Sequence, residues 1–151
     1  MNDKDIPQES MPIMDILMWR VIKLFLKNKK QILERLNLTC SQFEILSAIH
    51  YLQKFKSGII QAELSERTGI DPMTTSTILR NLEKKGFITR SRSIVNTRTV
   101  EVMLTANGVE LLEKAYQQIR SSSELIYKDV NKKYLASQLA KLSDKLNKLN
   151  Y

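Results

Sequence analysis

Apolar residues recur every three or four positions through most of the chain, which predicts a protein built mainly from long helices. The first apolar stripe, from Ile13 to Ile32, predicts a helix over residues 12–35. A second stripe lies beside the first, so this helix is expected to be buried on two sides. Two heptad-like stripes, over residues 109–130 and 135–149, predict long helices at the C-terminal end.

The middle of the chain carries helices with clear start and stop signals. Thr39 and Gln42 have the spacing of a capping box, which predicts the first turn of a helix. Residues 61–67 predict a short helix. Asp71, which is followed by a proline, is a typical N-cap residue, and the helix that it opens is expected to end at the left-handed C-cap Gly86.

A period of two residues replaces the helical period after this helix. The pattern predicts two strands, over residues 87–92 and 98–104. In the second strand Val100, Val102 and Leu104 are expected to face inward. The two strands are joined by a short turn, so together they predict a β-hairpin.

The short helix, the tight turn and the capped helix form the pattern of a helix-turn-helix, which places the start of its second helix in the major groove of DNA. Hydroxyl groups on such a helix can contact base edges, and apolar groups can contact the thymine methyl group. A guanidinium can bind guanine or phosphate, and the positive end of the helix dipole faces the phosphates. The candidate DNA-binding residues on this helix are Pro72, Met73, Thr74, Ser76, Thr77, Arg80 and Lys84.

The hairpin is interpreted as the wing of a winged helix, with a short polar tip. Arginine side chains on a wing can enter a narrow A·T-rich minor groove, where the negative potential is enhanced. A merely solvated basic hairpin is the alternative, but here it follows a helix-turn-helix within about 40 residues. The candidate DNA-binding residues of the hairpin are Arg90, Arg92, Asn96 and Arg98.

The distribution of charge supports this interpretation. The 151 residues include 24 Lys and Arg against 16 Asp and Glu, a net charge of +8, which favours nucleic acid as a partner ahead of an anionic membrane surface. Residues 80–98 hold six basic residues and one acidic residue, a net charge of +5. Residues 130–151 hold five lysines and one aspartate, a net charge of +4, for which the sequence suggests only a solvated helix face.

Composition argues against several other classes of protein. The single cysteine cannot form an internal disulfide, which fits the cytoplasm, and with a single histidine it excludes a His/Cys zinc site within one chain. The sequence has no nucleophile elbow, phosphate-binding glycine loop or cofactor motif, so we expect neither an enzyme nor a metal nor a cofactor. No apolar run approaches the roughly 18 to 20 residues of a membrane span, so no membrane association is expected.

Four segments have a familiar order and spacing: L-T-x-x-Q-F at 38–43, E-L-S-E-R-T-G-I at 63–70, T-x-x-x-L-x-x-L-E-K-K-G-F-I at 75–88, and L-T-x-x-G at 104–108. Together with Arg90 they resemble the MarR family of winged-helix transcriptional regulators. The resemblance implies a mainly α fold with a winged helix-turn-helix, a small β-hairpin wing and long N- and C-terminal dimerisation helices. It also implies an obligate homodimer that reads double-stranded DNA.

The same resemblance sets the expected division of the chain. Residues 1–37 would form an N-terminal dimerisation helix, residues 38–105 the winged helix-turn-helix DNA-binding domain, and residues 106–151 the C-terminal dimerisation helices. The wing departs from the family pattern, because Asn96-Thr97-Arg98 stands where the family typically carries D-x-R. Arg98 can still probe the minor groove, but the lost carboxylate predicts a more mobile wing.

The remaining candidate residues are interpreted structurally. Cys40 lies in the first turn of a helix, but it is expected to be a plain small residue rather than an oxidant sensor. His50 is expected to be a partly buried structural residue. Trp19, Tyr51 and Phe55 could line the cavity in which the family binds small aromatic anions, but core packing is the preferred interpretation.

The sequence therefore predicts a homodimeric transcriptional repressor of a pseudo-palindromic operator, with a small-molecule effector as its implied ligand. The alternative is a winged-helix protein-interaction module without DNA-binding activity. The operator, the regulated genes and the effector do not follow from the residues. We call the second helix of the helix-turn-helix, which begins after Asp71, the reading helix. The charge on this helix and on the wing separates the two hypotheses, because an interaction module need not keep these elements basic.

Overall fold

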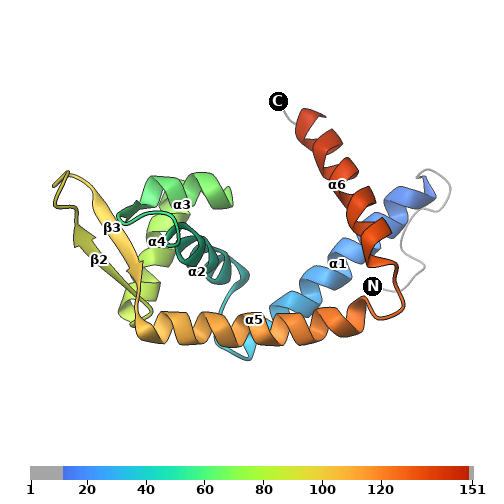
Figure 1. Cartoon of the computed structure of the whole chain (residues 1–151), viewed down its shortest axis with the longest axis horizontal. Coiled ribbons are helices and arrows are strands. Elements are labelled where there is room, and N and C mark those ends of the chain that lie inside the picture. Colours follow the sequence, from blue (N-terminus) through green and yellow to red (C-terminus); the bar gives the residue numbers. More distant parts are fainter. Residues whose placement is uncertain (1–11, 150–151) are drawn as a thin grey trace. The chain divides into compact units, whose positions relative to one another are not determined.

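The structure, a computed structural model, describes residues 12–149, and the elements of this range are labelled in Figure 1. Six helices and one three-stranded antiparallel sheet are present in the described range, which confirms the mainly helical fold with a small hairpin and long terminal helices. The chain forms two compact units, Met1–Tyr116 and Gln117–Tyr151. The elements are α1 (Ile13–Glu34), α2 (Cys40–Leu52), β1 (Ile59–Ile60), α3 (Gln61–Thr68), α4 (Pro72–Lys84), β2 (Ile88–Arg92), β3 (Val100–Leu104), α5 (Ala106–Ile126) and α6 (Lys132–Leu149).

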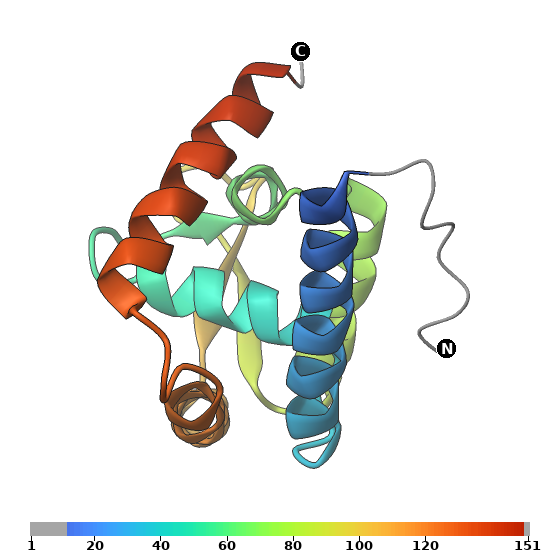
Figure 2. The same cartoon turned by 90° about the vertical axis from the view of Figure 1, so that its right-hand side faces the viewer.

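Helix α2 is the centre of the first unit. Its predicted capping box is complete, because Thr39 Oγ1 accepts the Gln42 N–H at 3.1 Å and Gln42 Oε1 accepts the Thr39 N–H at 3.0 Å. The helix packs against α3, α4 and β3, and Figure 2 shows it beside these elements. Ile45, Leu46 and Ile49 have no exposed surface, so α2 supplies much of the core that supports the reading elements.

The sheet has the strand order β1-β3-β2, so the predicted hairpin gains a third strand from the Ile59–Ile60 pair. Val102 is buried in the middle strand, as predicted. The prediction that Val100 faces the core is wrong: this side chain is 44% exposed, because it pairs with Arg92 at the far end of the hairpin, beyond the helices. The prediction that Arg98 begins the second strand is also wrong, because this residue lies in the turn that precedes β3.

A close backbone contact joins the start of α5 to the hairpin. Thr105 Oγ1 accepts the Gly108 N–H at 3.1 Å and donates to the Gly86 carbonyl at 2.7 Å, so it caps α5. A Cβ atom at Gly108 would lie 2.0 Å from the Phe87 carbonyl oxygen. Only glycine fits this approach, which explains physically why a glycine stands three residues after Thr105 in the sequence.

Helix α1 buries little of its apolar surface in the chain. Among its apolar residues only Ile32 and Leu33 are buried, and these lie in its last turn. The exposed apolar face, whose members are between 42% and 67% exposed, consists of Ile13, Met14, Leu17, Trp19, Val21, Ile22, Leu24, Phe25 and Leu26. Such a run of exposed apolar side chains is typical of a helix that packs against a second surface.

The prediction that Trp19, Tyr51 and Phe55 pack in the core is wrong for this chain. Their side chains are 57%, 44% and 70% exposed. Helix α2 ends at Leu52, so Phe55 lies in the turn after it rather than on the buried face of the helix. Trp19 belongs to the exposed apolar face of α1.

The second unit contains the end of α5 and helix α6. Asn131 Oδ1 accepts the Tyr134 N–H at 3.0 Å, which fixes the start of α6. Helix α6 has no buried residue, and its leucine stripe, which includes Leu139, Leu142 and Leu146, is exposed. None of the helices in residues 12–149 is both long and apolar enough to cross a membrane.

Candidate nucleic-acid interface

The turn between α3 and α4 is held by side chains from both helices. The Ile70 carbonyl accepts hydrogen bonds from Ser65 Oγ at 2.5 Å and from Thr75 Oγ1 at 3.1 Å. Gly69 ends α3 at a φ of +70°, and its N–H donates to the Ser65 carbonyl at 2.9 Å. Because Thr75 has no exposed surface, its hydroxyl is a satisfied core group rather than a DNA contact.

The first turn of α4 is capped as the sequence predicts. Asp71 Oδ1 accepts the Thr74 N–H at 2.9 Å. Hydrogen bonds from the Thr74 side chain and then from its backbone lower the pKa of Asp71 below its ordinary value. Gln61 Nε2 donates to the Pro72 carbonyl at 3.0 Å, which adds a second link between the starts of α3 and α4. The start of the reading helix α4 is thus fixed to the start of α3.

The two faces of α4 differ in exposure. The inner face buries Ile78, Leu79 and Leu82 against the core. Among the predicted DNA-binding residues of α4, Ser76 is half-buried at the edge of the outer face. The others are exposed, with Met73 at 82%, and they are Pro72, Met73, Thr74, Thr77, Arg80 and Lys84.

Side chains on the outer face of α4 also contact one another. Thr77 Oγ1 donates to the Met73 carbonyl at 3.1 Å and accepts from Arg80 Nη2 at 3.4 Å. The structure therefore brings an apolar side chain, a hydroxyl and a guanidinium together in two turns of exposed helix. These are the chemical groups that can read thymine methyls, base edges and guanine or phosphate.

Arg90 has a partner within the chain. Its Nε and Nη2 atoms lie 2.8 and 2.7 Å from the same carboxylate oxygen of Glu83 on α4. Sequence reasoning placed Arg90 with the DNA-binding residues and missed this ion pair. Glu83 is the one acidic residue in the basic stretch 80–98, which was the available signal. The pair joins strand β2 to the end of the reading helix.

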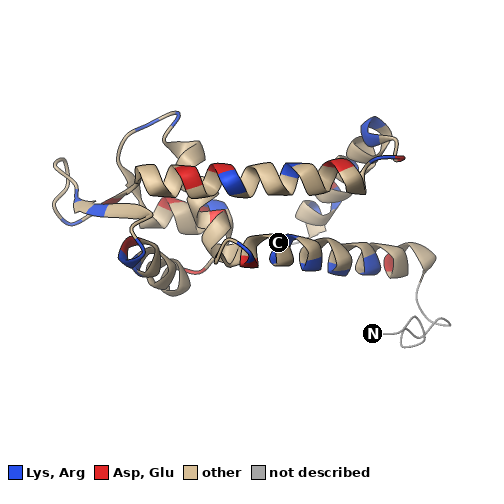
Figure 3. Cartoon of the chain, turned by 90° about the horizontal axis from the view of Figure 1, so that it is seen from below, with Lys and Arg blue, Asp and Glu red and all other residues tan. Residues whose placement is uncertain are grey.

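The remaining basic residues of this region extend outward. Arg80, Lys84, Arg92 and Arg98 are exposed, and Figure 3 shows basic positions on the hairpin and a mixture of both signs along α5. The Lys85 ammonium lies 3.5 Å from the Asn37 carbonyl, so this lysine is engaged with the connection before α2. The exposed positive charge is thus shared between the reading helix and the far end of the hairpin.

The tip of the wing, residues 93–99, is closed by hydrogen bonds of its own. Ser93 is buried, and its Oγ accepts the N–H groups of Val95 and Asn96 at 3.2 and 3.3 Å. The Asn96 carbonyl accepts both the N–H and the hydroxyl of Thr99, at 2.9 and 2.8 Å. Asn96 Oδ1 accepts the Arg98 N–H at 3.1 Å, so an amide braces the turn where a carboxylate was expected to be needed. The greater mobility of the wing stays a prediction.

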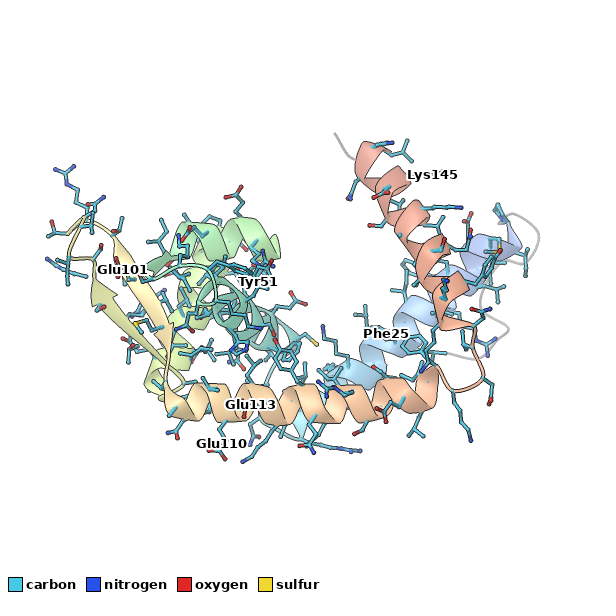
Figure 4. All side chains as sticks on the ribbon, viewed as in Figure 1. Phe25, Tyr51, Glu101, Glu110, Glu113 and Lys145 are labelled. Atoms are coloured by element: carbon cyan, nitrogen blue, oxygen red, sulfur yellow. The ribbon has the colours of Figure 1, made fainter. Side chains whose placement is uncertain are left out.

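The tip is not polar, contrary to the sequence-based interpretation. Ile94 and Val95 are 99% and 97% exposed, the highest exposures among the large apolar residues of the described chain. In Figure 4 side chains stand out around this end of the hairpin. Sequence reasoning passed over both residues because it weighed only the arginines and the asparagine of the turn.

A pocket of ≈ 440 Å³ lies behind the helix-turn-helix, among α2, the end of α3 and the first half of α5. The Arg67 guanidinium stacks 3.9 Å from the centre of the Tyr51 ring, which is labelled in Figure 4. Ser47 Oγ is buried and has no hydrogen-bond partner among the described residues. The lining consists of Phe43, Glu44, Ser47, Ala48, Tyr51, Arg67, Thr68 and Tyr116.

The lone candidate residues have ordinary surroundings. Cys40 is a free, half-buried thiol at the first residue of α2. His50 is half-buried, with its ring centre 6.4 Å from that of Tyr116, in agreement with a structural role. Within residues 12–149 no group of three or more His, Cys, Asp or Glu side chains could hold a metal ion.

Comparison with known proteins places this geometry among transcription factors. The sequence pattern of the MarR family matches residues 38–100. The chain is 30% identical over 129 residues to the uncharacterised HTH-type transcriptional regulator YwaE of Bacillus subtilis. The matched region covers 83% of this chain and 72% of the relative. The chain is also 28% identical over 106 residues to the HTH-type transcriptional repressor Rv2887 of Mycobacterium tuberculosis. This match covers 70% of this chain and 73% of the relative. The fold matches that of Staphylococcus aureus MepR in its DNA complex with a TM-score of 0.75, at 22% identity over 90% of this chain and 96% of the other.

Proposed function

The chain belongs to the MarR family of DNA-binding winged-helix transcriptional regulators, which are not enzymes, and from this premise we propose that it is a homodimeric repressor of a pseudo-palindromic operator. One observation carries the proposal: the capped helix α4 presents an exposed polar and basic face beside a basic hairpin, and both are fixed to one buried core. A protein-interaction module would not need this combination of charge and exposed hydroxyls. As a repressor of transcription the protein acts in the cytoplasm.

Helix α4 enters the major groove in this proposal. Thr74 and Thr77 contact base edges through their hydroxyls, and Met73 contacts thymine methyl groups. Arg80 binds guanine or phosphate, and Lys84 binds phosphate. Pro72 and Ser76 lie at the start and the edge of the same face and fix its approach to the sugar-phosphate backbone.

The wing enters the adjacent minor groove. Arg98 reads the groove, Arg92 contacts phosphate, and Asn96 holds the turn that presents Arg98. Arg90 remains in the DNA-binding set in a positioning role, because its guanidinium is bound to Glu83 of the reading helix.

The dimer uses the two terminal regions, residues 1–37 and 106–151, around a DNA-binding domain of residues 38–105; of the terminal regions, residues 1–11 and 150–151 lie outside the described residues. The exposed apolar face of α1 and the exposed leucine stripe of α6 support this division. In a two-fold dimer the reading helices meet half-sites about one helical turn apart, which requires a pseudo-palindromic operator. The repressor Rv2887 and the DNA complex of MepR support repression and DNA binding by analogy.

The pocket beside α3 supports a small aromatic anion as the effector. Its walls carry aromatic rings from Phe43, Tyr51 and Tyr116 and the cation Arg67, and the carboxylate of Glu44 in the lining lies 4.0 Å from the ammonium of Lys29. Because α3 and α4 share the hydrogen-bonded turn at Ile70, a ligand that moves α3 also moves the reading helix.

A salt series tests the proposed function. The dimer is titrated against a duplex selected from a random library and against a scrambled duplex of the same length, at several salt concentrations. We expect log affinity to fall linearly with log salt, with a slope of about −0.9 per phosphate contact, and tighter binding to the selected duplex at every salt. Absence of binding at low salt would leave the protein-interaction module as the better hypothesis.

The same titration tests the effector. Benzoate is the charged probe and benzamide is its neutral counterpart of nearly equal shape. We expect benzoate to weaken DNA binding and benzamide to have little effect, because only the anion can pair with Arg67. Equal effects of the two compounds, or an undiminished benzoate effect in Arg67→Gln, would contradict the assignment of the pocket.

A further inference from the structure

The tip of the wing presents an apolar pair where contact with DNA is expected to be most intimate. Ile94 and Val95 are adjacent, almost fully exposed, and flanked by the exposed cations Arg92 and Arg98. Single exposed apolar residues need no explanation, but two neighbours at the outermost point of a basic hairpin differ from the solvated residues that usually occupy a turn.

The hydrogen bonds of the tip decide what it can offer to a partner. The N–H groups of Val95 and Asn96 point back to Ser93 Oγ, and the N–H of Arg98 is taken by Asn96 Oδ1. These backbone donors are therefore unavailable to a phosphate. Between the two arginines the tip therefore offers the apolar side chains of Ile94 and Val95. The backbone that carries them is held in place by the hydrogen bonds of the turn.

We propose that Ile94 and Val95 form an apolar wedge that enters the minor groove and selects a flexible A·T step beneath the wing. The inference rests on the proposed function. Arg92 supplies charge complementarity to the phosphates and Arg98 to the negative potential of the groove, and the Glu83–Arg90 pair links the hairpin to the reading helix. Duplex DNA is thus the occupant that the charge around the tip favours.

The wedge has a defined sequence preference. Apolar side chains that enter the minor groove partly unstack a base step, which costs least at flexible pyrimidine–purine steps such as TpA. The exocyclic amino group of guanine obstructs the groove floor, so G·C pairs are disfavoured. A rigid A-tract has a narrow groove that attracts arginine but resists a wedge. Arg98 and the Ile94–Val95 pair therefore make different predictions for two kinds of A·T-rich flank.

Parallel selections from a random duplex library separate these roles. They are run with the wild-type dimer, with Ile94→Ser/Val95→Ser, and with Arg98→Ala as the matched wing variant. We expect the wild type to enrich TpA steps at the wing positions and the double variant to lose that enrichment while it keeps the sequence under α4. Arg98→Ala should keep the TpA preference and lose the preference for rigid A-tracts, whose narrow groove attracts arginine.

Two measurements on the selected duplex complete the test. The double variant should bind about tenfold more weakly than the wild type, with an unchanged salt slope, because it loses apolar contacts and no charge. A 2-aminopurine placed at the TpA step should brighten when the wild type binds and stay quenched with the double variant. Thermal unfolding should be unchanged, since both side chains are exposed in the folded chain.

The outcomes are distinguishable. If the wild type binds no duplex at low salt, the proposed function fails and the wedge fails with it. If the wild type binds specifically but the double variant selects the same flanks with the same affinity, the wedge alone is overturned. If the double substitution changes only the oligomeric state, the apolar pair contacts a second copy of the chain, which also overturns the proposal.

Discussion

Helices α1 and α4 are both amphipathic, yet they differ in where their apolar faces are covered. Helix α4 buries Ile78, Leu79 and Leu82 in its own chain and leaves a polar face outside. Helix α1 is longer, but it buries only Ile32 and Leu33 of its apolar residues. We call the elements from α2 to β3 the reading unit. The difference teaches that the apolar faces of this unit are covered within one chain, whereas α1 needs a second surface to cover its apolar face.

Charged residues introduced into the exposed apolar face of α1 should have the largest effect, which is expected on dimerisation. Leu17 and Leu24 are seven residues apart, so they share one side of the helix, and both are exposed in the chain. In Leu17→Glu/Leu24→Glu we expect the dissociation constant of the dimer to rise by about a thousandfold, because two carboxylates would be buried in an apolar interface. Sedimentation at several concentrations measures the change, and Lys27→Glu is the control on the same helix.

Hydrogen exchange of the same variant sharpens the comparison between the two helices. If the reading unit is complete within one chain, the amides of α4 should stay protected in the dissociated protein. Loss of protection in α4 together with loss of the dimer would show that the reading unit depends on the interface as well.

A pair of glycine substitutions tests the close backbone contact between the start of α5 and the hairpin. Gly108→Ala should destabilise the reading unit by about 3 kcal/mol, because the new Cβ overlaps the Phe87 carbonyl and the backbone must move apart. Gly86→Ala meets no atom within 4 Å and carries only the cost of a positive φ, so about 1 kcal/mol is expected. Urea unfolding compares the two variants, and equal losses would contradict the close approach of α5 to the hairpin.

The smallest expected effect concerns acid stability at the start of α4. The folded pKa of Asp71 is lowered, so its contribution to stability is present at neutral pH and is lost as the pH falls through that lowered pKa. Asp71→Asn keeps a good N-cap and removes the charge, so it should flatten the decline in stability between about pH 5 and pH 2. Urea unfolding at several pH values measures this slope. An unchanged slope, with Glu113→Gln as control, would mean that Asp71 is not coupled to folding.

Much of the reading unit was predictable because its signals are local. The capping box at Thr39 and Gln42, the N-cap Asp71 and the left-handed Gly86 each depend on residues within one turn of the chain. The three- and four-residue spacing of Ile78, Leu79 and Leu82 likewise marks the buried face of α4. These elements agree with the structure because local preference and tertiary packing point the same way.

The features that sequence reasoning missed depend on contacts between elements or on how far a hairpin extends. The Glu83–Arg90 pair joins a helix to a strand across the turn at Gly86, and residue periodicity carries no signal for it. Val100 follows the alternation of a buried strand but lies beyond the reach of the helices. The exposed aromatics have a similar cause, since the pattern shows which face is apolar but not whether the same chain covers it.

The Glu83–Arg90 pair has a mechanical consequence. It fixes the base of the hairpin to the end of α4, so the hairpin acts as a lever arm that turns with the helix. The part of β2 from Arg90 to Arg92 and the start of the turn beyond it give an arm of about 10 Å. A rotation of α4 by about 20° then moves the tip by about 3.5 Å, roughly the rise of one base pair along a strand. A rotation of the reading helix in the major groove is thereby passed on to the tip as a change of position along the minor groove.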